Sequence, residues 1–124
     1  MARWTGHTRL DPARALAHLL SPRPGRAATL AGSAAHLAAG SLLFPTAYAL
    51  LFEAARRADA PFGLAIGAVH GTLAGLALPL AHRHRDQEPA PGLFGHRLGT
   101  LTPPGLLAAH LLYGALLGHI YVVP

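Results

Sequence analysis

Four of the nine histidines lie in the interior of stretches that contain no charged residue, and they are the side chains with the clearest potential for chemistry. They are His36, His70, His110 and His119. A neutral imidazole can ligate haem iron or another metal ion and can carry protons. Helical rise places His36, His70 and His110 at similar depths in their segments, whereas His119 lies nearer one end. We therefore predict that His36, His70 and His110 are the cofactor-binding residues, if a cofactor such as haem b is bound.

Four interpretations of these histidines stay open. Haem would need two rings on facing helices and a wide apolar slot. Zinc or copper would need several convergent ligands, and no carboxylate lies inside the uncharged stretches to help. A proton path would need a continuous chain of polar partners, for which the nearby candidates are Ser33, Ser41, Thr72 and Tyr113. The structural alternative is that each neutral ring bonds a serine, a tyrosine or a carbonyl on a neighbouring helix.

The rest of the composition excludes most other chemistry. The chain has no cysteine, and its five acidic residues all lie outside the uncharged stretches. Phosphate loops, nucleophile elbows and paired carboxylates at regular spacing are absent from the sequence, so we assign no catalytic residue and no separate metal site and do not expect an enzyme. Net charge is +5, but the arginines flank apolar segments instead of forming a stripe, so we expect no nucleic-acid partner.

Charge distribution also indicates which elements hold the histidines. Three windows of 26, 23 and 27 residues (27–52, 60–82 and 98–124) carry no charge, and a helix of about 20 apolar residues crosses a bilayer. The sequence thus predicts an all-α membrane protein with three transmembrane helices at about 28–52, 61–81 and 104–123. Residues 1–27 form a basic interfacial segment with a short amphipathic helix that begins at Asp11 and Pro12, and residues 28–124 form the transmembrane domain. For 82–103, rich in proline and glycine, we predict no regular structure.

Glycines recur every four residues and predict close helix packing. Helix 61–81 carries the row Gly63, Gly67, Gly71 and Gly75, and shorter rows contain Gly32, Gly40, Gly114 and Gly118. In lipid, such rows permit close backbone contact between helices. Pro45 and Pro79 each remove a backbone donor, so we expect kinks one turn before them.

Arginine counts give the expected orientation. Eight arginines lie in 1–27 and 82–103, whereas the connection between the first two predicted helices has two and the C-terminal tail none. By the positive-inside rule the N-terminus is inside and the C-terminus outside, in the bacterial inner membrane.

The chain also resembles a known group of proteins. The residues that carry the likeness are His36 to Tyr48, the glycine row through Pro79, Gly92 to Gly95, and the run of His110, Leu111, Gly114, Gly118 and Tyr121. These resemble small uncharacterised bacterial inner-membrane proteins of the YagU-like type. The resemblance implies a membrane protein and transfers no activity.

The function that we predict is that of a small structural or accessory membrane subunit assembled through its glycine rows. Its expected partners are the lipid bilayer and either further copies of the chain or a larger membrane protein. Two alternatives remain: a haem- or metal-binding electron-transfer anchor that uses the intramembrane histidines, and a small transporter or proton-conducting protein.

Overall fold

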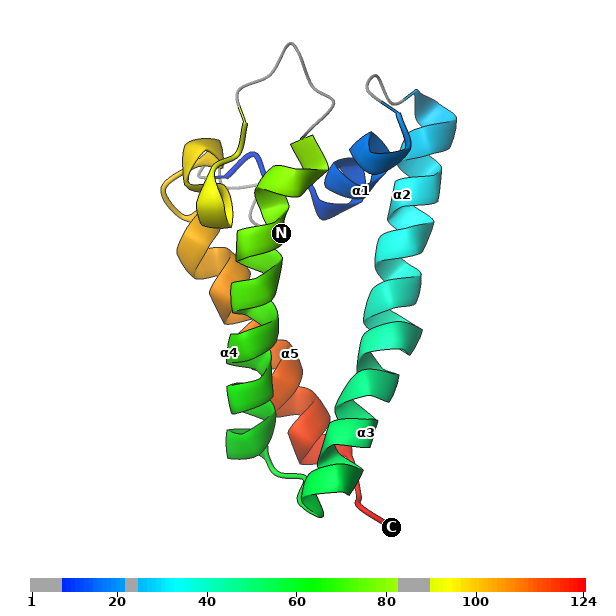
Figure 1. Ribbon diagram of the computed structural model, residues 1–124, viewed down its shortest axis with the longest axis vertical. Coiled ribbons are helices and arrows are strands. Elements are labelled where there is room, and N and C mark those ends of the chain that lie inside the picture. Colours follow the sequence, from blue (N-terminus) through cyan, green and yellow to red (C-terminus); the bar gives the residue numbers. More distant parts are fainter. Residues whose placement is uncertain (1–7, 22–24, 83–89) are drawn as a thin grey trace.

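The computed structural model describes residues 8–21, 25–82 and 90–124, and every regular element within these ranges is a helix. The prediction of an all-α chain is therefore confirmed. In Figure 1, α4 (Ala60–Ala77) and α5 (Thr102–Ile120) cross one another, and a long helix stands beside them. That long helix is built from α2 (Arg26–Ala38), the π-helical segment η2 (Ala39–Leu43) and α3 (Phe44–Ala55).

A short helix, α1 (Pro12–Leu20), precedes the long one and begins where the sequence predicts. The side chain of Asp11 caps it by accepting a hydrogen bond from the backbone N–H of Arg14 at 3.0 Å, and Pro12 occupies the first turn. α1 packs against α2 where Gly32 leaves room, because a Cβ on Gly32 would overlap the carbonyl oxygen of Ala13 and crowd Ala17. Gly32 is the one buried residue of α2.

The long helix absorbs Pro45 by changing its hydrogen-bond pattern. Proline lacks the N–H that an α-helix would direct to Ser41, and the preceding turn widens into the π-helical η2. The hydroxyl of Thr46 donates to the carbonyl of Leu42 at 2.7 Å. Around Pro79 the helix instead tightens into the 3₁₀ segment η3 (Leu78–His82). The helix type changes at the predicted turn before Pro45, whereas near Pro79 it changes only from Leu78 and not one turn before the proline, where the kink is predicted.

Part of the second predicted loop is ordered, so the prediction of no regular structure is wrong for η4 (Leu93–Leu98). This segment consists of 3₁₀ turns joined at Phe94 and Gly95, which have φ of 54° and 70°. The Phe94 ring packs directly over Gly75 of α4, and the N–H of Arg9 donates to the carbonyl of Leu98 at 2.8 Å. These tertiary contacts stabilise a conformation for which local sequence carries no periodic signal.

Large apolar side chains cover the outside of the helices. On the long helix Leu30, Leu37 and Leu42 are about 70% exposed, and on α4 Leu73 is 61% exposed. Two helical stretches of the described residues, Arg26–Ala55 and Ala60–Leu80, are long and apolar enough to cross a membrane. α5 is long enough but less apolar than these two stretches, because its two prolines and two histidines lower its mean hydropathy.

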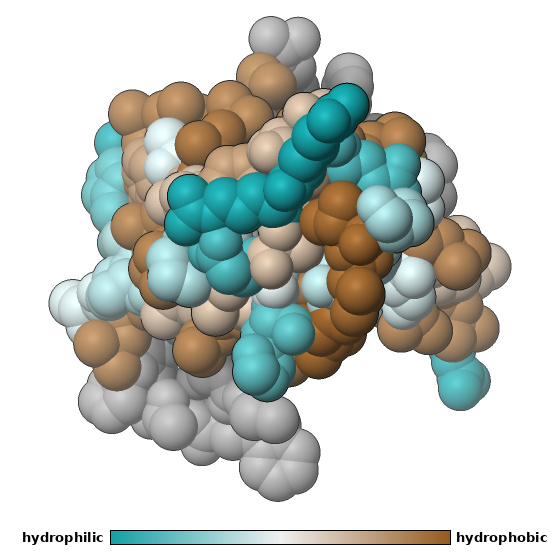
Figure 2. Space-filling view, turned by 90° about the horizontal axis from the view of Figure 1, so that it is seen from below, coloured by the Kyte–Doolittle hydropathy of each residue, from teal (hydrophilic) through white to brown (hydrophobic). Residues whose placement is uncertain are grey.

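Hydrophilic residues gather at the end of the molecule where α3 leads into α4. Figure 2 looks onto this end and shows them across the middle of the face, with hydrophobic residues around them. The charged residues of this region are Glu53, Arg56, Arg57 and Asp59. Figure 1 places α1 and η4 at the opposite end.

Candidate site: a histidine and tyrosine cluster

Five rings from three helices meet where the long helix contacts α4 and α5. Phe44 and Tyr48 come from α3, His70 comes from α4, and His110 and Tyr113 come from α5. The ring centroids of His70 and His110 lie 4.6 Å apart, with planes at 83°. The ring of Phe44 lies 4.0 Å from that of His70, and Tyr113 lies 5.6 Å from Tyr48. We name these five residues the histidine cluster.

In both histidines of the cluster, Nδ1 takes part in a hydrogen bond. In His110 the Nδ1–H donates to the carbonyl of Leu106, one turn earlier, at 2.8 Å. A neutral imidazole carries one proton, so Nε2 of His110 is then an acceptor. In His70 the Nδ1 atom lies 3.2 Å from the hydroxyl oxygen of Tyr48. Both Nδ1 atoms are thus held by protein groups, and these two bonds leave both Nε2 atoms free to interact.

Glycines allow α4 and α5 to approach closely enough for the two rings to touch. A Cβ on Gly67 would overlap the backbone carbonyl of His110, and one on Gly71 would lie 2.9 Å from the Cβ of His110. Farther along the same contact, Gly63 and Gly114 oppose each other backbone to backbone, and Gly118 faces the carbonyl of Asp59. The predicted glycine row of α4 therefore lies against α5 as far as Gly71, and Gly75 receives the ring of Phe94.

Two predicted members of the glycine set lie away from this contact. Gly32 packs on α1, as described above. A Cβ on Gly40 would meet no atom within 4 Å, although the backbone carbonyl of Gly40 accepts a hydrogen bond from the Tyr113 hydroxyl at 2.7 Å. That bond ties the π-helical segment to α5.

The structure brings together two of the three predicted cofactor-binding histidines. His36 is exposed on α2 and lies one turn before Gly40. From that point the long helix diverges from α4 toward the end where α1 lies (Figure 1), so His36 has no ring contact with His70 or His110. His119 is likewise exposed, near the end of α5.

The histidine cluster contains no acidic group. Within the described residues no group of three or more histidines and carboxylates is arranged to hold a metal ion. The nearest acidic residues along α3 and α4, Glu53 and Asp59, belong to the charged end of the molecule. Any cation bound in the cluster would therefore keep its full charge.

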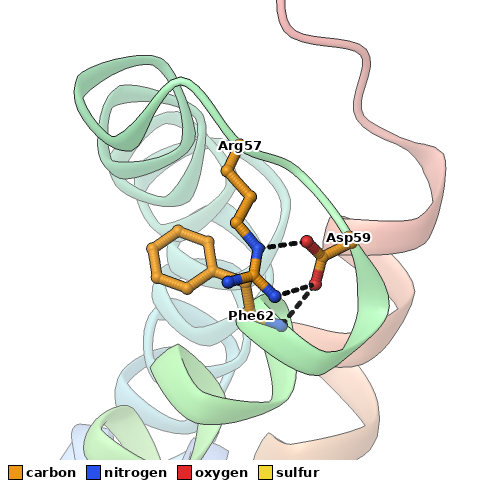
Figure 3. A network of polar contacts seen from close by, with 3 residues as sticks. All are labelled: Arg57, Asp59 and Phe62. Atoms are coloured by element: carbon orange, nitrogen blue, oxygen red, sulfur yellow. Dashed lines mark hydrogen bonds and ion pairs between the residues drawn. The ribbon is translucent and has the colours of Figure 1, made fainter.

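At the charged end, Asp59 organises the start of α4. Its carboxylate accepts a hydrogen bond from the N–H of Phe62 at 2.8 Å and pairs with the guanidinium of Arg57, whose Nη2 donates at 3.1 Å (Figure 3). The Arg57 guanidinium also lies 5.4 Å from the centroid of the Phe62 ring. The hydrogen bond from Arg57, followed by that from the Phe62 N–H, lowers the pKa of Asp59.

Tyr121 marks the same end on α5. Its hydroxyl donates to Oε1 of Glu53 at 2.6 Å. The ring of Tyr121 lies 5.6 Å from that of Phe52, which is fully buried. Aromatic packing thus continues from the histidine cluster through Tyr48 and Phe52 to this end.

The comparisons with known proteins give no family. No family model, no curated protein and no solved structure matches the chain. The function is therefore inferred from the geometry alone, and the likeness to the YagU-like type stays a prediction.

Phe44 and Tyr48 were not among the predicted site residues. A signal was present, because Phe44, Tyr48 and Phe52 recur at intervals of four and so share one helix face. Their partner on α4, His70, has no ring in its own helix at such spacing. Only the packing of α3 on α4 brings the two sets together.

Proposed function

We propose that this chain is a small integral membrane protein that crosses the bilayer three times and serves as a structural or accessory subunit. The observation that carries the membrane assignment is the exposure of its apolar side chains. In the most apolar 18 residues of Arg26–Ala55, only 11% of the residues are buried, and in those of Ala60–Leu80 only 22% are. Helices in the core of a water-soluble protein bury such faces, whereas lipid covers them at no cost.

The third crossing is inferred from packing. α5 has 19 residues and lies against α4 from Gly118 beside Asp59 to the region of His110 beside Gly67. Because α4 is proposed to span the bilayer, a contact over this length supports a third crossing by α5. The prolines of α5 are confined to its first turn, where they leave the hydrogen bonds of the helix intact.

Charge supports the orientation that we propose, with the N-terminus inside, the C-terminus outside and the bacterial inner membrane as location. The described residues Arg9, Arg14, Arg26 and Arg97 belong to the N-terminal segment, the start of α2 and η4. The arginines at positions 3, 23, 83 and 85, on which the orientation also depends, lie outside the described residues. Fusion of a reporter that is active only outside the membrane should give activity after Pro124 and none when it replaces the chain after Ser21.

The accessory role is proposed because α2 has little to pack on within the chain. It buries one residue, and that residue faces α1. Conversely, the glycine row of α4 is occupied by α5 and η4 and is not available to another protein. Photo-crosslinkers at Ala34 on α2 and at Leu73 on α4 test this in cells. Crosslinks to a membrane protein from Ala34 support the role, and crosslinks to lipid alone from both sites contradict it.

A cofactor-binding role is the second candidate, and the contact of His70 with His110 favours it. A haem would have to place its macrocycle between the two rings, where the backbones of Gly67 and His110 already meet. The cluster is therefore better suited to a small ion than to haem. Absorbance of the purified protein checks this, because bound haem gives a Soret band. A proton-conducting role remains an alternative, tested by proton flux in liposomes with His70→Asn as the comparison.

A further inference from the structure

We propose that His70 and His110 form an intramembrane site for a single monovalent soft cation, of which the cuprous ion is the physiological example. The ligands are the two Nε2 atoms. This inference does not rest on the accessory role. The site does not include His36, which lies on α2 away from the other two histidines.

The hydrogen bonds at Nδ1 are those that prepare a histidine for metal binding. Histidines that ligate a metal through one nitrogen usually donate the other N–H to a carbonyl or another fixed acceptor, which sets the tautomer and the ring orientation. The Nδ1–H of His110 donates to the carbonyl of Leu106 at 2.8 Å, and Nδ1 of His70 lies 3.2 Å from the Tyr48 hydroxyl oxygen. In the tautomer with hydrogen on both Nδ1 atoms, each Nε2 presents a lone pair.

The separation of the rings is close to what one bridging ion requires. Metal–nitrogen bonds of about 2.0 Å place the centroids of two ligating imidazoles about 5–6 Å apart, for angles at the metal between tetrahedral and linear. The rings of His70 and His110 are 4.6 Å apart, edge to face. The centroid of each ring lies close to its Cβ–Cγ axis, so turning the ring does not change this distance. A change of about 10–15° in χ1 of both side chains, which stays within one rotamer well, opens the distance without moving the helices.

Charge selects a monovalent ion. The desolvation cost of an ion in a medium of low dielectric constant rises with the square of its charge, and anionic ligands are what usually offset it. The groups that face the pair are Phe44 and Tyr48 from α3 and Tyr113 from α5, all uncharged, and neither α4 nor α5 has an acidic residue between its ends. Two neutral imidazoles therefore suit Cu(I), which accepts two nitrogen ligands, better than Zn(II), which usually takes four ligands.

The test uses the full chain in nanodiscs, in a background where His82 and His84, a His-x-His sequence, are replaced by alanine so that they cannot bind the probe. Cu(I), kept reduced under anaerobic conditions, is titrated against a chromophoric chelator, and Ag(I) serves as a probe that does not change oxidation state. We expect one equivalent bound. His70→Asn and His110→Asn should each weaken binding by more than about 100-fold, and Tyr48→Phe should weaken it by about 10-fold or more, as is typical for loss of a group that orients a ligand.

His36→Asn and His119→Asn are matched controls, because each removes an exposed histidine from an apolar helix, His36 from α2 and His119 from the α5 helix that carries His110. Binding unchanged in His70→Asn or His110→Asn, or weakened equally in His36→Asn, overturns the proposal. X-ray absorption of the bound copper provides a readout that does not depend on the variants. Two nitrogen neighbours support the site, and three or four light-atom neighbours contradict it.

Discussion

The hydroxyl oxygen of Tyr48 on α3 lies 3.2 Å from Nδ1 of His70 on α4, and this hydrogen bond joins the long helix to the pair formed by α4 and α5. Tyr48 is 2% exposed, so water does not replace the bond when it is lost. Tyr48→Phe should lower the free energy of unfolding by about 0.5–1.5 kcal/mol, the range for a hydrogen bond between helices in a membrane. Unfolding by denaturing detergent in mixed micelles measures this.

A double-mutant cycle separates that bond from ring packing. Phenylalanine keeps the ring that packs on Phe52 and Tyr113, so Tyr48→Phe should have little further effect once His70 is replaced by alanine. Equal losses in the presence and absence of His70 would show that the hydroxyl acts through something else.

The contact of Gly63 with Gly114 gives a second prediction. A Cβ on either residue would overlap the backbone of the opposite helix, and backbone cannot move aside as a flexible side chain can. Gly114→Leu should therefore separate α4 from α5 and lower the free energy of unfolding by about 3 kcal/mol or more, at the upper end of overpacking effects. Gly105→Leu on the same helix is the control, because a Cβ there meets no atom within 4 Å. If both variants unfold alike, the α4–α5 contact is not the site of the effect.

Phe94 should hold η4 to α4. Its ring fills the space beside Gly75, and its backbone is kept at φ 54°, which a residue other than glycine rarely adopts. Phe94→Ala should cost up to about 3 kcal/mol, somewhat less than for a fully buried ring, and should raise amide hydrogen exchange in 93–98. Phe94→Gly, which relieves the backbone but also removes the ring, should show the same increase in exchange. Unchanged exchange in both variants would mean that other contacts hold the segment.

How far the sequence predicts this structure differs from element to element. Gly63, Gly67 and Gly71 are predicted to share a face, and they do so for a reason that is local: a spacing of four in a helix fixes their direction. The contact of His70 with His110 depends in addition on two antiparallel helices that cross at the depth of both residues. The estimate of depth along each helix predicts that the two residues lie at a similar level. His36 has a similar estimated depth but lies on a helix that diverges from α4, and depth along a helix carries no information about the angle between helices. The 3₁₀ turns of η4 and the pairing of Tyr48 with His70 likewise arise from tertiary contacts.

The packing of α1 on α2 gives a prediction that compares two glycines of one helix. A Cβ on Gly32 would overlap the carbonyl of Ala13 and approach Ala17, whereas one on Gly40 meets nothing within 4 Å. Gly32→Leu should release α1 and speed amide exchange between residues 12 and 20, and Gly40→Leu should leave this exchange unchanged. Release of α1 in both variants would indicate a general loss of the fold instead of a local clash.

Asp59 makes the charged end sensitive to acid. Its pKa is lowered in the folded protein by the hydrogen bonds from Arg57 and from the N–H of Phe62, so folding favours the carboxylate. The stabilisation is fully present above the ordinary pKa of about 3.9 and is lost as the pH falls through the lower folded value. Asp59→Asn keeps an N-cap, because asparagine caps helices as well as aspartate does, but it removes the ion pair with Arg57. The melting temperature of the original protein should therefore exceed that of Asp59→Asn at neutral pH, and the two should converge in acid. Glu53→Gln removes the other carboxylate at this end and should not abolish this convergence. If the melting temperatures of the original protein and of Asp59→Asn still differ below the folded pKa of Asp59, the charge of the carboxylate is not the source of the difference.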